Sequence, residues 1–156
     1  MNFTQELDRY DIDILKALSS DGRLSGRDLA ERVGLSLTPT LRRVKRLEDE
    51  RFIQGYEARL DERRLMGAIS VFVAVTLEKQ TETALAEFER RIVLCPEVMS
   101  CFLMTGDADY SLRVVVPGLD AYQHFLTRTL TTIPGVQHIK SSFALKTVLV
   151  RSSPLL

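Results

Sequence analysis

A basic amphipathic stretch that begins at Ser36 restricts the possible folds of this chain more than any other feature, because its apolar residues recur at helical spacing. Leu41, Val44 and Leu47 follow one another at intervals of three and predict one buried helix face. Ser36 suits an N-cap, since its hydroxyl can accept a backbone N–H of the first turn. Pro39 is tolerated only near a helix start, where its missing N–H has no intrahelical partner. The sequence therefore predicts a helix from about residue 36 to residue 48.

The same helix carries four cations and no carboxylate between Ser36 and Leu47. These cations are Arg42, Arg43, Lys45 and Arg46. Thr38 and Thr40 are expected near the exposed N-terminal end of the helix. Short polar side chains at the tip and cations behind it are typical of a DNA recognition helix, in which the tip contacts base edges and the cations bind phosphates. An ordinary surface helix with a solvated basic face is the alternative, and this stretch alone does not separate the two.

The residues before this helix favour the DNA-binding interpretation. Asp8 is suited to cap a first helix, and Ser25 with Asp28 three residues later resembles the capping box of a second. Gly34 is placed to end that second helix in the left-handed conformation, which leaves only a tight turn before Ser36. Two helices joined by such a turn, preceded by a supporting helix, form a helix-turn-helix. The predicted DNA-binding residues are Arg23, Ser25, Ser36, Thr38, Pro39, Thr40, Arg42, Arg43, Lys45 and Arg46.

The pattern changes after residue 50. Residues 52–60 indicate an extended, wing-like strand. We interpret the charge run at residues 61–64 as the connection to a second domain, where a solvated helical turn fits at least as well as any contact role. We therefore expect a winged-helix-like domain over residues 1–60, a linker to about residue 67, and a second domain over residues 68–156.

The second domain alternates between β-rich and helical patterns. Strands are predicted at residues 69–77, 98–105, 110–116 and 136–150, and helices at residues 84–93 and 121–130. The order βαββαβ is that of the ferredoxin-like fold, so the whole chain is placed in the α+β class. This architecture supports many functions and identifies none by itself.

Composition narrows the functional classes. The chain has 156 residues, 45% of them hydrophobic, and no apolar run of transmembrane length, so we expect a folded cytoplasmic protein with no signal peptide and no membrane partner. Its net charge of zero does not by itself indicate a nucleic-acid partner. Cys95 and Cys101 are expected to be reduced, packed thiols, and His124 and His138 lack a neighbouring partner that would indicate a triad or a metal site. We predict no enzymatic activity, no metal and no cofactor.

Seven ordered segments carry a resemblance to a known family. They are residues 7–15, Asp21–Ser25, Leu35–Val44, Phe52–Tyr56, the Gly-Asp-x-Asp-Tyr sequence Gly106–Tyr110, Ile133–Val136 and Ser141–Lys146. Over nearly its whole length the chain resembles the Lrp/AsnC (feast/famine) transcription regulators, and the last segment resembles a subgroup that includes regulators of branched-chain amino-acid catabolism. The family usually has proline and cysteine where Leu37 and Thr40 stand, which predicts an unusual base preference near the helix start, and commonly glycine where Arg51 stands.

The resemblance implies a sequence-specific DNA-binding regulator that responds to an amino acid. It implies a homodimer built through the ferredoxin-like domains, often assembled further into an octamer, with the effector in a cleft between dimers near Gly106. Gly106 lets a ligand approach the backbone N–H groups, and Asp107 or Asp109 can accept an α-ammonium group. The effector residues that follow are Leu103, Met104, Thr105, Gly106, Asp107, Ala108, Asp109, Tyr110, Ser142 and Phe143. Their apolar members favour leucine, another branched-chain amino acid or methionine.

Other interpretations stay open on the sequence. Without the resemblance, the Gly106 segment is better explained as a solvent-exposed turn in which glycine supplies a positive φ and both aspartates cap the turn. The second domain would also suit an amino-acid-binding or enzymatic protein whose helical head binds a partner. A protein that compacts DNA without sensing any ligand is the remaining alternative.

Overall fold

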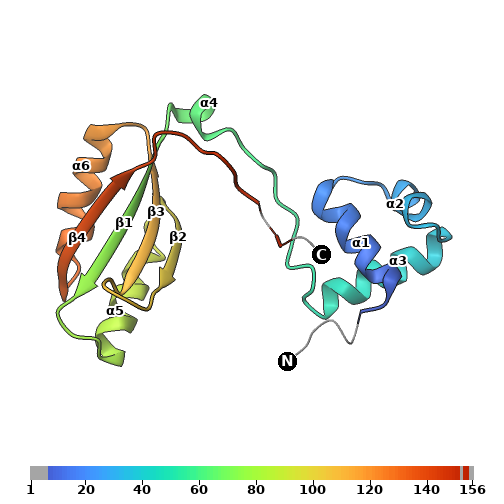
Figure 1. Ribbon diagram of the computed structural model, residues 1–156, viewed down its shortest axis with the longest axis horizontal. Coiled ribbons are helices and arrows are strands. Elements are labelled where there is room, and N and C mark those ends of the chain that lie inside the picture. The colour runs from blue at the N-terminus through green and yellow to red at the C-terminus, as the bar shows by residue number, and fades with distance from the viewer. Residues whose placement is uncertain (1–6, 152, 155–156) are drawn as a thin grey trace. The chain divides into compact units, whose positions relative to one another are not determined.

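Residues 7–151 and 153–154 are described by a computed structural model, which divides the chain into two compact units (Figure 1). The first unit extends to Arg59 and includes the described residues from Leu149 onward, and the second spans Leu60–Val148. Each unit has a hydrophobic core of its own.

Three helices form the first unit. They are α1 (Arg9–Ser20), α2 (Gly26–Val33) and α3 (Leu37–Asp49). Asp8 caps α1 and the Ser25 hydroxyl accepts the Asp28 N–H at the start of α2, as the sequence predicts. At α1 the cap is a reciprocal capping box, which Asp11 completes. Gly34 ends α2 with a φ of 70°. The buried core of this unit consists of Ile14, Ala17, Leu29, Val33 and Leu47.

The buried face of α3 is shifted from the predicted one. Thr40 and Leu47 are fully buried, whereas Leu41 is 48% exposed. Leu41 lies over the start of α2, where Gly26 has no side chain, and a Cβ added at Gly26 would come within 2.8 Å of Leu41. The two helices therefore approach closely at this glycine, and the core side of α3 is centred on Thr40 and Leu47.

The segment after α3 is not a strand, so the wing-like strand predicted over residues 52–60 is wrong. Arg51 turns the chain with a φ of 64°, and Phe52 and Ile53 then pack against the core of the first unit. The Ile53 N–H donates to the Leu47 carbonyl at 3.0 Å. Within the described part of the unit the segment has no partner strand. A β-prone side-chain pattern does not form a strand without a neighbour to hydrogen-bond with.

The charge run that follows forms a short helix, α4 (Glu62–Met66). Asp61 caps α4 by accepting the Arg64 N–H at 3.1 Å, and Gly67 ends it with a φ of 65°. The run is therefore a helical turn, and it lies where the second unit begins.

The second unit has the predicted βαββαβ order. Its elements are β1 (Ile69–Leu77), α5 (Glu82–Ile92), β2 (Val98–Leu103), β3 (Tyr110–Val116), α6 (Leu119–Arg128), the 3₁₀ turn η2 (Leu130–Thr132) and β4 (Val136–Phe143). The strands form one antiparallel sheet in the order β2-β3-β1-β4, which is the ferredoxin-like arrangement.

β4 ends at Phe143, so the strand predicted to run to residue 150 is too long. Its partner β1 begins at Ile69, and the register pairs Val71 with Phe143. One further bond, from the Ala144 N–H to a β1 carbonyl, closes the ladder. The β-prone residues after Ala144 have no more of β1 to pair with, which is why the strand stops.

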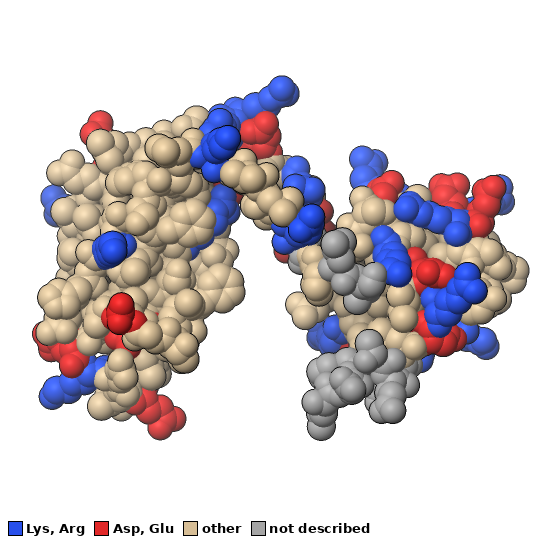
Figure 2. All heavy atoms as spheres, in the orientation of Figure 1, with Lys and Arg blue, Asp and Glu red and all other residues tan. Residues whose placement is uncertain are grey.

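α5 and α6 cover one face of the sheet, and the core of the second unit lies between them and the strands. The core includes Val71, Val73, Val75, Leu112 and Val114 from the strands and Phe88, Ile92, Tyr122 and Phe125 from the helices. The opposite face, here called the open sheet face, leaves Phe72 48% and Phe102 61% exposed. Figure 2 shows few charged side chains on the visible face of this unit, whereas cations and carboxylates alternate over the three-helix unit.

Cys95 and Cys101 are free thiols that are partly buried, in agreement with the prediction. Burial raises the pKa of both thiols, so neither is activated as a nucleophile. Over the described ranges, no helix is both long enough and apolar enough to span a membrane.

Candidate nucleic-acid interface and ligand site

The solvent side of α3 presents a stripe of three predicted DNA-binding residues. Thr38, Arg42 and Lys45 are spaced by four and three residues, which places them on one face of the helix. All three are exposed, whereas Thr40 and Leu47 on the opposite face are fully buried. This outward stripe of α3 (Thr38, Arg42 and Lys45) is therefore accessible to a macromolecular partner along its whole length.

The N-terminal end of α3 differs from the prediction at Thr40. Its side chain is fully buried, and its hydroxyl donates to the Ser36 carbonyl at 2.9 Å. A threonine bonded back to the preceding turn is satisfied within the helix, so the placement of Thr40 at an exposed tip is wrong. Thr40, where the sequence comparison above expects cysteine, therefore does not alter the exposed surface of α3. Ser36 holds the N-cap position, but its exposed side chain makes no capping hydrogen bond, contrary to the prediction.

Arg43 and Arg46 point away from the outward stripe and bind α1. Arg43 Nη1 lies 2.8 Å from Asp11 Oδ1 and 2.7 Å from Asp8 Oδ2. Arg46 Nη2 binds the second carboxylate oxygen of Asp11. The Asp11 side chain is only 1% exposed, and its carboxylate also accepts the Asp8 N–H. Two of the four cations on α3 are therefore paired within the protein.

The pKa values agree with this ion cluster of Asp8, Asp11, Arg43 and Arg46. Burial raises the pKa of the Asp11 carboxyl, but hydrogen bonds from Arg46 and Arg43 outweigh it and hold the pKa below its usual value. The bonds to Asp11 raise the pKa of both guanidinium groups. The Tyr10 ring, 5.5 Å from the Arg43 guanidinium carbon, adds a cation–π contact. Asp11 is therefore a charged, fixed anchor for α3 at neutral pH.

Besides Ser36 and Thr40, three predicted DNA-binding residues lie outside the stripe and the ion cluster. Arg23 is exposed in the turn between α1 and α2. Ser25 engages its hydroxyl with Asp28, accepting the backbone N–H and donating to the carboxylate at 2.7 Å. Pro39 lies in the first turn of α3 and is partly buried.

Sequence reasoning missed Asp11 as a functional candidate. Its spacing from Asp8 indicates a capping box, which the two residues do form. The contact with α3 joins residues 32 and 35 positions apart, and no local pattern reports such a distance.

The hairpin between β2 and β3 holds most of the predicted effector residues. Gly106 has a φ of 119°, and no atom lies within 4 Å of the place where a Cβ would stand, so the backbone and not crowding favours glycine there. Leu103 and Met104 are 59% and 47% exposed. Thr105 and Asp107 are also exposed. The hairpin therefore offers apolar surface, a carboxylate and a backbone turn to solvent.

Asp109 lies beneath this turn and is 5% exposed. Its carboxylate accepts the Leu77 N–H at 2.7 Å and the Gln80 side-chain amide at 2.6 Å. Its own N–H donates to the Val75 carbonyl at 2.9 Å. Asp109 therefore fixes the hairpin to the end of β1, which leaves Asp107 as the exposed carboxylate of the pair.

Tyr110 belongs to the core of the second unit and is 1% exposed. Its ring stacks on Phe88 with centroids 4.4 Å apart, and its hydroxyl donates to Glu89 at 2.7 Å. Burial and the hydrogen bond to Glu89 raise its pKa. The side chain faces the helices and not the turn, so its predicted contact with an effector is wrong.

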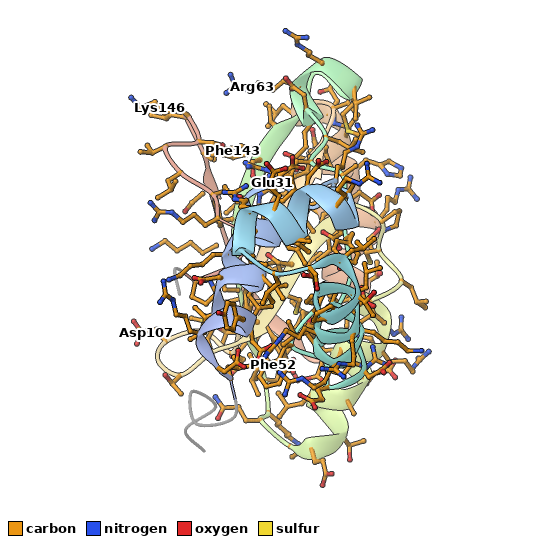
Figure 3. The ribbon with its side chains drawn as sticks, turned by 90° about the vertical axis from the view of Figure 1, so that its right-hand side faces the viewer. Glu31, Phe52, Arg63, Asp107, Phe143 and Lys146 are labelled. Atoms are coloured by element: carbon orange, nitrogen blue, oxygen red, sulfur yellow. The ribbon has the colours of Figure 1, made fainter. Side chains whose placement is uncertain are left out.

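The strand register separates Ser142–Phe143 from the hairpin. Phe143 pairs with Val71, whereas Tyr110, at the base of the hairpin, pairs with Val75. Four residues of strand correspond to roughly 13 Å. Asp107 and Phe143 accordingly lie near opposite ends of the sheet (Figure 3). The hairpin and Phe143 therefore do not lie together within a single chain, and one site could include both only between copies of the chain.

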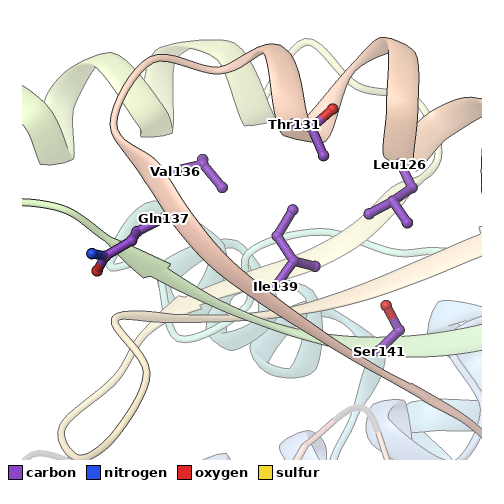
Figure 4. A pocket seen from close by; sticks show the side chains of 6 residues that line it. All are labelled: Leu126, Thr131, Val136, Gln137, Ile139 and Ser141. Atoms are coloured by element: carbon purple, nitrogen blue, oxygen red, sulfur yellow. The ribbon is translucent and has the colours of Figure 1, made fainter.

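A groove lies in a third place, between α6 and β4 (Figure 4). It is lined by Leu126, Thr131, Val136, Gln137, Ile139 and Ser141. The Thr131 hydroxyl donates to the Thr127 carbonyl, and the Ser141 hydroxyl is bonded to Tyr122. Both hydroxyls are already engaged within the protein, and none of the predicted effector residues lines this groove.

Comparison with known proteins assigns both units. Residues 7–54 match the family described as winged helix-turn-helix DNA-binding, and residues 70–154 match the Lrp/AsnC ligand binding domain. The chain belongs to the Lrp/AsnC family. As in other Lrp/AsnC proteins, a DNA-binding head is followed by a ligand-binding domain, and the fold class predicted from the sequence is confirmed.

Individual Lrp/AsnC proteins are similar over nearly the whole chain. The Bkd operon transcriptional regulator of Pseudomonas aeruginosa is 72% identical over 149 residues, which cover 96% of this chain and 97% of that protein. The leucine-responsive regulatory protein of Escherichia coli is 40% identical over 144 residues, with coverages of 92% and 88%. A Neisseria meningitidis transcriptional regulator, solved as an L-Met complex, superimposes with a TM-score of 0.90 at 38% identity, covering 95% of this chain and 96% of that one. The chain is accordingly a DNA-binding transcription regulator and not an enzyme.

Proposed function

We propose that α3 reads an operator through its outward stripe and that an apolar amino acid bound at the β2–β3 hairpin regulates this binding. The observation that carries the first half is the exposure of Thr38, Arg42 and Lys45 on the face opposite the core. Arg42 and Lys45 supply cations for phosphate oxygens or guanine edges. Thr38 and the uncommitted hydroxyl of Ser36 lie at the end of the helix that enters the major groove.

Substitution Arg42→Ala tests this assignment. The probe is an operator selected from a random-sequence DNA library by repeated rounds of binding to the full chain. Loss of one phosphate contact should weaken binding and reduce the slope of log K against log salt by about 0.9. Arg128→Ala, which removes an exposed cation from α6, is the matched control and should leave the slope unchanged. An Arg42→Ala slope equal to that of the wild type would contradict the assignment.

The proposed effector is leucine, another branched-chain amino acid or methionine. The exposed Leu103 and Met104 side chains suit an apolar ligand, and each buried methylene contributes about 0.8 kcal/mol. Asp107 is available for the α-ammonium group, and the turn at Gly106 offers backbone N–H groups to the α-carboxylate. The related proteins named for leucine response and crystallised with L-Met support the same class of ligand.

We place the ligand between copies of the chain, in a homodimer or a higher assembly such as an octamer. A small-molecule site buries most of its ligand, and an exposed hairpin cannot do so alone. The open sheet face supports assembly, because Phe72 and Phe102 are aromatic rings left in contact with water. A second copy packed on this face would cover both rings.

The assembly is tested by sedimentation velocity on Phe72→Glu. The wild type should sediment as a dimer or a larger species, and a carboxylate in the middle of the apolar interface should shift the variant to the monomer. Leu119→Glu places the same charge on an exposed apolar residue of α6 and should leave the assembly intact. Equal sedimentation of wild type and Phe72→Glu would exclude the open sheet face as the interface.

The effector is tested by thermal shift with each amino acid, followed by gel retardation with those that bind. A ligand present at about 100 times its Kd stabilises the folded state by about 2.7 kcal/mol, which is a measurable shift in Tm. Asp107→Asn should abolish the shift, whereas Asp120→Asn, an exposed aspartate of α6, should retain it. A full shift in Asp107→Asn would place the ligand elsewhere. No shift with any amino acid, together with intact DNA binding, would favour the architectural interpretation.

The 72% identity to a Bkd operon regulator leads us to infer that the target is an operon for branched-chain amino-acid catabolism. Retardation of the DNA upstream of the branched-chain keto acid dehydrogenase genes of the source organism tests this inference. Binding no tighter than to random-sequence DNA would refute it.

A further inference from the structure

The four cations of α3 differ in what surrounds them. Arg42 and Lys45 are exposed on the outward stripe, whereas Arg43 and Arg46 reach back to the first turn of α1. The Arg43 side chain is 26% exposed, and the carboxylate that it shares with Arg46 is 1% exposed. A buried carboxylate that accepts from two guanidinium groups and from a backbone N–H is a fixed element of the structure.

We infer that Asp11 is a specificity-determining residue, because it fixes the orientation in which the recognition helix presents its base-reading side chains, and that it also withdraws Arg43 and Arg46 from phosphate binding. Phosphate contacts act on every DNA sequence alike, whereas base contacts distinguish one sequence from another. An α3 helix with four free cations would bind random DNA more tightly without reading the operator better. This inference rests on the proposal that α3 is the DNA-reading helix.

The two arginines are not equivalent in this arrangement. Arg43 has a second acidic partner in Asp8 and lies against the Tyr10 ring, whereas Asp11 is the only acidic partner within 4 Å that the described residues give Arg46. An asparagine at position 11 keeps one carbonyl oxygen and loses the charge. Arg43 would therefore stay on α1, and Arg46 would become free to bind a phosphate.

The experiment measures the slope of log K against log salt for a random-sequence duplex and for the selected operator. Asp11→Asn should steepen the slope on random DNA by about 0.9, which corresponds to about a three- to fourfold change between 50 and 200 mM salt. The ratio of operator affinity to random-DNA affinity should also fall, because α3 is then held less firmly in the orientation that presents its base-reading side chains. Adding Arg46→Gln to Asp11→Asn should restore the wild-type slope, because the released cation is then absent.

Arg43→Gln with Arg46→Gln in the otherwise wild-type chain is the complementary test. Because both arginines are already paired with carboxylates, this double variant should leave the salt slope on random DNA unchanged. Arg42→Gln with Lys45→Gln removes the same charge from the outward stripe and should reduce the slope by about 1.8. Circular-dichroism melting of each variant, with binding measured well below its Tm, separates loss of folding from loss of contact.

The outcomes distinguish the role inferred for Asp11 from the proposal that α3 is the DNA-reading helix. A reduced slope for Arg43→Gln with Arg46→Gln would show that these arginines bind phosphate and would overturn the inference. The same holds if Asp11→Asn leaves the slope unchanged or makes it shallower, as a purely structural role of Asp11 predicts. If Asp11→Asn does not fold, the salt slope of the double variant Arg43→Gln with Arg46→Gln still tests the inference. An unchanged slope for Arg42→Gln with Lys45→Gln would instead refute α3 as the reading helix.

Discussion

The two units each bury an aspartate, Asp11 in the helical head and Asp109 in the sheet domain, and they satisfy these carboxylates differently. Asp11 is held mainly by two guanidinium groups from a helix more than thirty residues away. Asp109 is held by two neutral donors, the Leu77 N–H and the Gln80 side-chain amide. The first carboxylate therefore offsets cationic charge, and the second fixes the geometry of the hairpin.

This difference shows that burial alone does not define the role of an acidic residue. Removing Asp11 releases cations, which can find water or phosphate instead. Removing Asp109 leaves the Leu77 N–H buried without an acceptor, and water cannot easily replace the lost one. We therefore expect the sheet domain to depend on its aspartate for stability and the head to depend on its aspartate for selectivity.

The largest effect is expected for Asp109→Ala. Loss of the two hydrogen bonds that the Asp109 side chain accepts, one of them from a buried backbone N–H, should reduce the free energy of unfolding by about 3 kcal/mol. Urea denaturation followed by circular dichroism measures this change. Asp107→Ala, two residues away and exposed, should change stability by less than about 0.5 kcal/mol. Similar losses in the two variants would remove the distinction between the buried and the exposed aspartate of the hairpin.

Asp11→Asn should destabilise the chain less, by about 2 kcal/mol at neutral pH, because solvent reaches both arginines and weakens the ion pairs. The pKa of Asp11 is held below its value in the unfolded chain, so its contribution is present above a pH of about 4 and is lost as the pH falls through the folded-state pKa. Urea titrations at descending pH should therefore show the wild type converging on the variant in acid. A stability difference that stays constant down to the acid limit would show that Asp11 does not act through its charge.

A smaller effect is expected for Gly106→Ala. The space around Gly106 is open, so a methyl group meets no neighbour, and the loss of about 1–2 kcal/mol comes from the positive φ alone. Gly55→Ala is the matched control, because that glycine also has open space and its φ is not in the positive range. Thermal melting of both variants gives the comparison, and equal Tm values would mean that the hairpin turn is not strained by a side chain.

The head should show the opposite sign at its non-glycine residue with a positive φ. Arg51 adopts a φ of 64° directly after α3. Arg51→Gly removes the left-handed penalty but adds freedom to the unfolded chain, for a net gain of about 0.5–1 kcal/mol. An increase in the urea midpoint measures this gain. A lower midpoint would show that contacts of the arginine side chain outweigh the backbone strain.

The sequence predicts those features that are encoded locally. The caps at Asp8, Ser25 and Gly34 each combine a residue type with a spacing of a few positions, and all three form as expected. The order of strands and helices follows from hydrophobic period in the same way. The turn at Gly106 is predicted in the same way from a single glycine, which does adopt a positive φ.

Features that depend on distant partners escaped prediction. Thr40 occurs one residue before an apolar position and gives no sign in the sequence of its burial. Leu41 instead lies against Gly26 of α2, a contact between two helices. The pairing of Asp11 with Arg46 spans 35 residues. Phe143 is expected beside Leu103 and Met104 as apolar surface for a ligand, and only the strand register shows that it lies apart from the hairpin within one chain.

The exposed rings of Phe72 and Phe102 also have a consequence for dosage. If copies of the chain associate through this face, the fraction of paired heads follows the law of mass action and rises with the number of molecules per cell. Two linked heads bind adjacent half-sites with an effective concentration that a single head lacks. Occupancy of the operator would then rise more steeply than the amount of protein, so that a modest change in synthesis produces a sharper change in transcription.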